Sequence, residues 1–203
     1  CVAVGKEVWI VSAWTGDYPL EDNVDKIYIY NTDEDTWSTK PGLPVNRQRG
    51  GAAAVLYQGE IYVSHGNVGG HGEHATSYGW LDKYNIANEE WIINLPDAPH
   101  PRDHTGGAVV NGELCVAAGR DGGDANFFNE VILETDCYNF ETKKWRTAAS
   151  IPQGRAGSSY GQTCDGKLMV AGGEGFGRAF SNVDIFDGTS WTAAGDLVTG
   201  RHG

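Results

Sequence analysis

The sequence predicts an all-β protein, a β-propeller of about four blades that each contain four antiparallel strands. Three observations lead to this fold class: an internal repeat of roughly 50 residues, two-residue turn signals between short apolar runs, and the absence of helical periodicity. A four-stranded sheet that recurs every ~50 residues is typical of a propeller blade. All 203 residues take part in the repeat.

Four markers in a fixed order define the repeat. Tryptophans spaced 54, 54 and 46 residues apart occur at Trp37, Trp91, Trp145 and Trp191. An aromatic residue followed by Asn or Asp precedes each of them, as Tyr30-Asn31, Tyr84-Asn85, Tyr138-Asn139 and Phe186-Asp187. An arginine follows each of them, at Arg49, Arg102, Arg155 and Arg201. A tight-turn signal is the fourth marker, at Gly5-Lys6, Gln58-Gly59, Asn111-Gly112 and Asp165-Gly166. The blades therefore span approximately 1–48, 49–101, 102–154 and 155–200, and 201–203 open a further blade.

The second copy illustrates how each unit divides into four strands. The expected strands are 52–57, 60–64, 80–86 and 90–93, with a Gly-rich stretch between the second and the third. Turns such as Asn111-Gly112 and Asp187-Gly188 supply the positive φ angles that two-residue hairpins need, so consecutive strands pair antiparallel.

Together these motifs resemble the kelch repeat. The kelch repeat has a pair of small residues after its second strand, which is Gly172-Gly173 in the fourth copy and Ala118-Gly119 in the third. The second copy has His65-Gly66 at this place, and the first has Ser12-Ala13. The resemblance implies a ring of six or seven blades. The first copy lacks its opening Arg, so we expect a four-blade fragment whose partners include further blades of the same chain. The resemblance specifies a fold and leaves the function open.

Charge and composition exclude several classes of function. Fifteen basic and 27 acidic side chains give a net charge of −12, which argues against nucleic acid as a partner. No apolar run is long enough for a membrane span, so no membrane insertion is expected. The compartment, cytoplasmic or secreted, stays open.

The four cysteines are Cys1, Cys115, Cys137 and Cys164, and their spacing matches no zinc motif. We favour buried free thiols over a disulfide such as Cys115–Cys137, although an oxidising compartment would permit that bridge.

The recurring Trp and Arg residues have a structural and a functional interpretation. A Trp in the same strand of every blade is expected to pack against the neighbouring blade rather than to stack on a ligand. The arginines Arg49, Arg102, Arg155 and Arg201 recur near the central channel. There they either hold backbone carbonyls, which we favour, or form a ring that binds carboxylates.

The loops that differ between copies are the expected binding region. Loops between strands two and three and the returns between blades open on one face, and the long ones are roughly 13–25, 66–79, 120–130 and 174–182. Candidate binding residues there are Trp14, Tyr18, His71, His74, Tyr78, Arg120, Asp121, Phe127, Phe128, Phe176 and Arg178. The Phe127-Phe128 pair is the strongest of these candidates. The alternative is that these aromatic rings pack over the edge of the sheet.

A metal site is a weaker candidate on the same face. His71, Glu73 and His74 could ligate Zn²⁺ or Cu²⁺, but no other copy supplies a second ligand pair. We therefore expect no metal and no cofactor.

The sequence favours a scaffold that binds a protein partner, or a small ligand or glycan, through the loop face. No catalytic set is identifiable, since no Ser or Cys has the context of an activated nucleophile. Alternatives are a copper oxidase of the galactose oxidase type or a carbohydrate-active enzyme with its site partly in further blades, and a purely architectural module.

Overall fold

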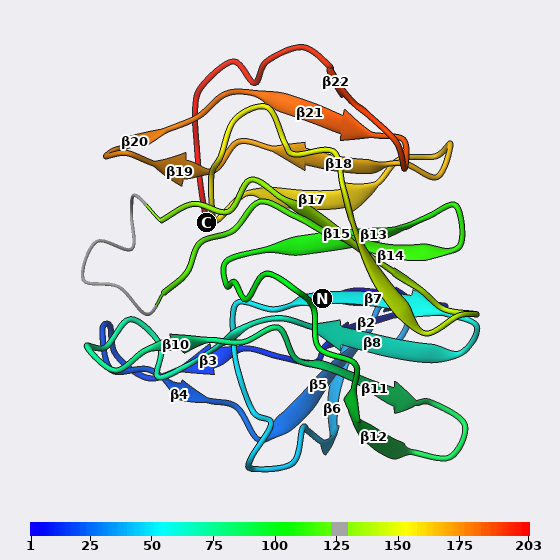
Figure 1. The fold of residues 1–203 in the computed structure, drawn as a ribbon. Helices are drawn as coiled ribbons and strands as arrows, with labels where there is room; N and C mark the ends of the chain where they lie inside the picture. The colour runs from blue at the N-terminus through cyan, green and yellow to red at the C-terminus, as the bar shows by residue number, and fades with distance from the viewer. Residues whose placement is uncertain (123–129) are drawn as a thin grey trace.

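Four antiparallel four-stranded sheets follow one another along the chain in the computed structural model, which describes residues 1–122 and 130–203 (Figure 1). Blade 1 contains β1 (Val2–Val4), β2 (Glu7–Ile10), β5 (Lys26–Asn31) and β6 (Thr36–Pro41). Blade 2 contains β7 (Ala53–Tyr57), β8 (Glu60–Ser64), β11 (Leu81–Asn85) and β12 (Glu90–Leu95). Blade 3 contains β13 (Gly106–Val110), β14 (Glu113–Ala117), β15 (Thr135–Asn139) and β16 (Lys144–Ala148). Blade 4 contains β17 (Ser159–Gln162), β18 (Leu168–Ala171), β21 (Val183–Phe186) and β22 (Trp191–Ala193).

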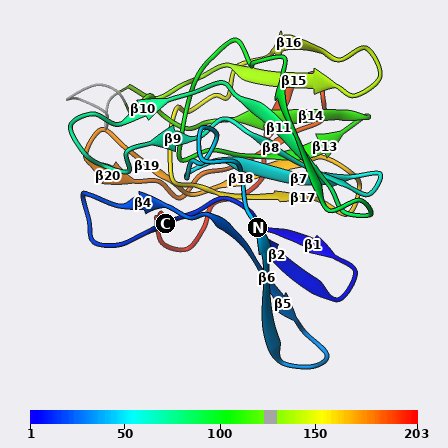
Figure 2. The same cartoon turned by 90° about the horizontal axis from the view of Figure 1, so that it is seen from below.

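The first strands of the blades are the inner ones. β7 contacts β1 on one side and β13 on the other, and β13 also contacts β17. These four strands line a channel of about 580 Å³. Figure 2 shows the sheet of blade 1 at one end of this series. The predicted all-β propeller of four blades is therefore confirmed, and the strands expected in the second copy lie within two residues of the observed ones.

The loops between the second and third strands contain short hairpins that the sequence did not predict. They are formed by β3 (Trp14–Thr15) with β4 (Asp22–Asn23), β9 (Asn67–Val68) with β10 (Thr76–Ser77), and β19 (Glu174–Gly175) with β20 (Arg178–Ala179). Figure 1 shows these hairpins on one side of the propeller, opposite the tight turns. We call this side, together with the returns between blades, the loop face.

Turn chemistry explains two of the repeat markers. Gln58-Gly59 and Asn111-Gly112 both have positive φ at the two central positions, as a type I′ hairpin requires. The Asn after each aromatic marker closes the outer hairpin, because its side-chain oxygen accepts backbone N–H groups two or three residues further on. Asn139, for example, accepts from Glu141 and Thr142 at 3.1 and 2.8 Å.

The repeated tryptophans join neighbouring blades, as expected. The indole N–H groups of Trp91, Trp145 and Trp191 donate to backbone carbonyls at or just after the end of the preceding blade's outer strand, at 3.2, 2.7 and 2.9 Å. Trp37 is different: it is 61 % exposed, because no preceding blade lies against it among the described residues.

The small pair after the second strand allows the chain to turn towards the next blade. Both residues adopt positive φ in three copies, which favours glycine, and His65 and Ala118 adopt it too. In these copies the N–H of the second residue donates to the carbonyl of the next blade's Arg, as from Gly119 to Arg155 at 2.8 Å. Blade 1 lacks this pair, and the hydroxyl of Ser12 donates to the Arg49 carbonyl instead.

A disulfide links Cys115 of β14 to Cys137 of β15, which are directly opposite each other in the sheet. Our preference for free thiols was therefore wrong for this pair, because the sheet register places two residues 22 positions apart side by side. Cys1 and Cys164 are free and exposed. None of the described residues forms a helix long and apolar enough to cross a membrane.

Candidate functional site

The repeated arginines lie inside the blades rather than on a channel wall. Arg49, Arg102 and Arg155 are at most 1 % exposed. Each pairs with a carboxylate in the third strand of its blade. The pairs are Arg49–Asp82 at 2.7 Å, Arg102–Asp136 at 2.6 Å and Arg155–Asp184 at 2.8 Å. The guanidinium groups also donate to backbone carbonyls, as Arg49 does to Val63 at 3.0 Å.

Burial is the largest influence on the pKa of Arg49 and of Arg102, and it lowers both. It lowers the pKa of Arg49 to about 10, and the nearby Asp82 carboxylate opposes this effect. Their ion pairs and carbonyl contacts leave no cationic surface for a ligand, which supports the structural interpretation. Arg201 is exposed, and its guanidinium donates to the Thr199 carbonyl at 3.3 Å.

A cavity of about 450 Å³ opens on the loop face, and all four blades contribute to it. Blade 1 supplies two aromatic rings from its β3–β4 hairpin, blade 2 a histidine, blade 3 a histidine and an arginine, and blade 4 a glutamate. The lining residues are Trp14, Tyr18, His71, His104, Arg120, Gly157, Glu174, His202 and Gly203. The cavity therefore lies where the loops of separate blades meet.

Two histidines face each other in this cavity. The Nε2 atoms of His71 and His104 are 3.1 Å apart. The other ring nitrogen of each contacts a carboxylate: His71 Nδ1 lies 2.8 Å from Glu21, and His104 Nδ1 contacts Asp103. Because an ionised carboxylate only accepts and a guanidinium only donates, each Nδ1 carries a proton and the Nε2 of His104 accepts from Arg120 at 3.1 Å.

Both carboxylates behind these histidines are held in the ionised form. Burial opposes ionisation of Asp103, but hydrogen bonds from His104, Ser77 and Asn67 outweigh it and lower the pKa of the carboxyl. For Glu21 burial also raises the pKa, and hydrogen bonds from its own backbone N–H and from His71 lower it below the usual value. The two imidazole rings are therefore each held in orientation by an ionised carboxylate.

Blade 4 joins the site through an ion-pair chain. Arg120, which is 3 % exposed, lies 2.9 Å from Glu174 and 3.1 Å from the Nε2 atom of His104. The other oxygen of Glu174 is 3.4 Å from His202. The site therefore combines three carboxylates, three imidazoles and one guanidinium.

Aromatic rings form one wall of the cavity. Trp14 lies against both imidazoles, with ring centroids 5.4 Å from His71 and 5.2 Å from His104. Tyr18 lies 5.0 Å from His71 and is 68 % exposed. This wall packs against the two imidazoles at Trp14 and is open to solvent at Tyr18.

The structure brings only part of the predicted binding set together. Trp14, Tyr18, His71 and Arg120 line the cavity described above. His74 and Asp121 line a neighbouring hollow of about 620 Å³ with the backbone of β10.

The remaining predicted residues lie elsewhere on the loop face or outside the described residues. Tyr78 stacks on Trp80 at 3.8 Å. Phe176 is 54 % exposed in the β19–β20 hairpin, and Arg178 lies over Phe180 at 4.9 Å. The Phe127-Phe128 pair lies outside the described residues.

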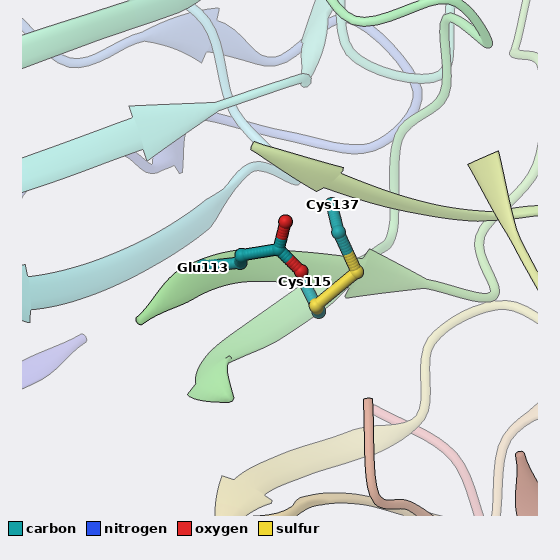
Figure 3. Close-up of side chains that lie close together, drawn as sticks. All are labelled: Glu113, Cys115 and Cys137. Carbon is teal, nitrogen blue, oxygen red and sulfur yellow. A yellow bond between two sulfur atoms is a disulfide. The ribbon is translucent and has the colours of Figure 1, made fainter. Parts of the chain in front are cut away.

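The donor atoms of His71, Glu73 and His74 do not gather into one ligand set. Among residues 1–122 and 130–203, three potential ligands lie within 4.8 Å of one another only at Glu113, Cys115 and Cys137 (Figure 3). The two sulfur atoms there are bonded to each other, so they do not offer thiolate ligands.

Sequence reasoning missed five residues of the site: Glu21, Asp103, His104, Glu174 and His202. Two of them carried a signal, because a His follows the blade-opening Arg closely in Arg102-Asp103-His104 and in Arg201-His202. Glu21 carried none, since its partner His71 is 50 residues away.

Comparisons with known proteins agree with this architecture. The chain is 30 % identical over 189 residues to "Kelch-like protein terF" of Aspergillus terreus, covering 88 % of this chain and 39 % of that protein. It is 25 % identical over 163 residues to "Kelch-like protein 41b" of Danio rerio, covering 77 % and 24 %. An F-box/kelch-repeat protein of Arabidopsis thaliana is 24 % identical over 194 residues, covering 85 % and 42 %. No protein-family profile matches.

A solved structure, "Structure of YjhT", superposes with a TM-score of 0.72 at 17 % identity, covering 95 % of this chain and 67 % of that one. The fold and its repeated turn, Arg and Trp positions thus define a four-bladed segment of a β-propeller. The chain is similar in sequence to kelch-repeat proteins, and its fold is that of a kelch-type propeller. It spans less than half the length of the curated relatives that it matches.

Proposed function

We propose that this chain is a binding scaffold that takes a protein partner on its loop face. The observation that carries this proposal is where its exposed apolar side chains lie. Of the ten large apolar side chains that are exposed among the described residues, four lie in blade strands. The other six all lie in loops of this face. They are Tyr18, Leu20, Val45, Leu133, Phe176 and Val198.

Such a distribution is typical of an interface. Exposed aromatic and aliphatic side chains at the rim of a hollow supply the anchors that dominate binding energy. Tyr18, which lines the 450 Å³ cavity, is 68 % exposed, and Leu20 two residues further on is 77 % exposed. Phe176 is 54 % exposed in the blade 4 hairpin whose Glu174 also lines the cavity. Two relatives are named as kelch-like proteins, and loops carried on a rigid scaffold are common sites of binding residues.

The test compares two sets of variants of the full-length protein in quantitative affinity purification from its host cells. One set replaces Tyr18, Leu20 and Phe176 by Ser, and the matched control replaces the exposed strand residues Leu56 and Ile92 by Ser. We expect the first set to raise the dissociation constant of the purified partner at least tenfold, which is a loss of about 1.4 kcal/mol in binding free energy. The control should stay within twofold of wild type.

Thermal unfolding of both sets separates loss of contact from loss of fold. Equal binding by wild type and the loop-face set, at equal melting temperature, would refute the proposal. A catalytic role would show instead as turnover of a substrate that depends on the cavity side chains.

A further inference from the structure

We propose that the partner of the loop face presents a basic segment, and that one Lys or Arg side chain of this segment enters the cavity of about 450 Å³. This inference rests on the proposed protein-binding function and adds the charge of the partner to it. Three features of the loop face point to a cationic side chain: the aromatic wall of the cavity, a carboxylate in the cavity, and the acidic loops around it.

The aromatic wall is the first feature. Trp14 and Tyr18 both line the cavity, and Tyr18 is 68 % exposed. The Trp14 indole packs against the backbone of Gly50 and Gly51, and a Cβ at Gly50 would collide with it. Tryptophan and tyrosine rings attract Lys and Arg side chains through the negative face of their π-systems. The apolar stems of Lys and Arg also pack on aromatic surface, so both parts of such a side chain fit this wall.

A partly exposed carboxylate on the blade 4 side is the second feature. Glu174 lines the same cavity, and its side chain is 19 % exposed. One of its oxygens lies 2.9 Å from Arg120, and the other lies 3.4 Å from the exposed His202. Each carboxylate oxygen has two lone pairs, so the oxygen near His202 has room for a further donor. Glu21, Asp103 and Glu174 against Arg120 leave a net charge of about −2 with neutral imidazoles, so the cavity is negative despite the guanidinium.

The charge of the surrounding loops is the third feature. The loops between the second and third strands are 11–25, 65–80, 118–134 and 172–182. Their described parts contain six exposed acidic side chains, which are Asp17, Asp22, Asp25, Glu73, Asp121 and Glu130. In the same parts Arg178 is the one exposed arginine, and the sequence has no lysine in these loops.

Basic side chains gather instead on the opposite side of the propeller. Lys6, Lys143 and Lys167 lie in the tight turns there. Figure 1 shows these turns opposite the short hairpins. An acidic surface attracts a basic partner and repels an acidic one, so the loop face is complementary to a basic segment.

Exposed apolar side chains beside the cavity favour a protein segment over a free amine. Leu20 follows the cavity residue Tyr18 by two positions, and Phe176 follows the cavity residue Glu174 by two. A small ammonium or guanidinium compound has no group that covers these side chains. A segment with apolar residues next to its Lys or Arg covers them and removes their apolar surface from water.

The first experiment selects peptides from a random dodecapeptide library on phage, with the full-length protein as bait. We expect Lys and Arg to be enriched about threefold or more over the unselected library, together with aromatic and aliphatic residues. Asp and Glu should be depleted, because the loop face is acidic. Each enriched peptide is then tested on the variant in which Ser replaces Tyr18, Leu20 and Phe176.

Single variants test the cavity through the affinity of an enriched peptide, measured by fluorescence anisotropy. Tyr18→Leu removes the aromatic ring and Tyr18→Phe keeps it. Glu174→Gln removes a charge at nearly constant shape. Its matched control is Glu141→Gln, because Glu141 is exposed in the β15–β16 turn on the opposite side. We expect the dissociation constant to rise about fivefold or more in Tyr18→Leu and Glu174→Gln, and to stay within about twofold in the two controls.

A peptide in which Gln replaces every Lys and Arg completes a double-mutant cycle with Glu174→Gln. This replacement should weaken binding about tenfold or more in the wild-type protein. It should weaken binding by a smaller factor in Glu174→Gln, because the interaction between the two charges is already absent there. Thermal melts of every variant separate loss of contact from loss of fold.

The outcomes separate this inference from the proposed function. Acidic or uncharged peptides that lose their binding in the Tyr18, Leu20 and Phe176 variant would overturn the basic partner and leave the proposed function standing. Peptides that bind this variant as well as wild type would refute both. A basic peptide whose affinity is unchanged in both Tyr18→Leu and Glu174→Gln would refute entry of its side chain into the cavity.

Discussion

Removing the carboxylate of Asp136 should destabilise the propeller more than any surface change. The Asp136 side chain is fully buried and accepts from Arg102 at 2.6 Å and from His100 at 2.9 Å. In Asp136→Ala the Arg102 guanidinium keeps its contacts with the Ala118 and Glu134 carbonyls, at 3.2 and 2.7 Å, but loses its counter-charge. Breaking a buried ion pair by removing one partner costs about 3–5 kcal/mol.

For a chain of this size each kcal/mol lowers the melting temperature by about 2–4 °C, so a fall of roughly 6–20 °C is expected. The assay is urea unfolding followed by Trp fluorescence, together with a thermal melt. The control is Asp33→Ala, which breaks the exposed Lys6–Asp33 pair and should cost less than about 1 kcal/mol.

A double variant sharpens the test. Replacing Arg102 by Met and Asp136 by Leu removes both charges together, so it should recover most of the stability that Asp136→Ala loses. If Asp136→Ala lowers the free energy of unfolding by less than about 1 kcal/mol, the buried charge of Arg102 does not need this carboxylate and the reasoning is refuted.

Three further predictions concern single contacts. Ser12→Ala removes the hydroxyl donor to the Arg49 carbonyl and should cost about 1–2 kcal/mol in urea unfolding; an unchanged midpoint would show that the contact is dispensable. Replacing Cys115 and Cys137 together by Ala should cost about 2–4 kcal/mol, and reductant should then lower the melting temperature of wild type only. Burial raises the pKa of Tyr160 to about 12. Since the unfolded value is ~10, stability should fall as pH rises from about 10 to 12, and Tyr160→Phe should show a shallower fall in pH-dependent melts.

Most of the fold was predictable because each blade repeats the same local chemistry. Asn111-Gly112 predicts a hairpin, since its positive φ angles favour few other structures. The 54-residue spacing of Trp91 and Trp145 then predicts equivalent strands. Both indoles indeed bind a carbonyl at or just after the end of the preceding blade's outer strand. The short hairpins of the loop face were missed, because their strands are only two residues long.

The candidate site was predictable only in part. Irregular loops with aromatic and His residues predicted a binding region on the loop face, and Trp14, Tyr18 and His71 of that set line its cavity. The weak metal candidate in the sequence paired His71 with His74, which is three residues away. The structure instead places His71 against His104, which is 33 residues away and in another blade. Sequence distance carries no information about such a contact.

The sequence by itself determined the repeated blade, its turns and its acidic balance, because these depend on residue type and on spacing within one blade. The tertiary structure decided which loops meet, that Cys115 and Cys137 pair, and that two imidazoles face each other across blades. Those features depend on sheet register and on how neighbouring blades pack, which bring together residues that no local pattern connects. The physical reason is that a propeller builds its loop face from segments some 50 residues apart, so the chemistry of that face arises only on folding.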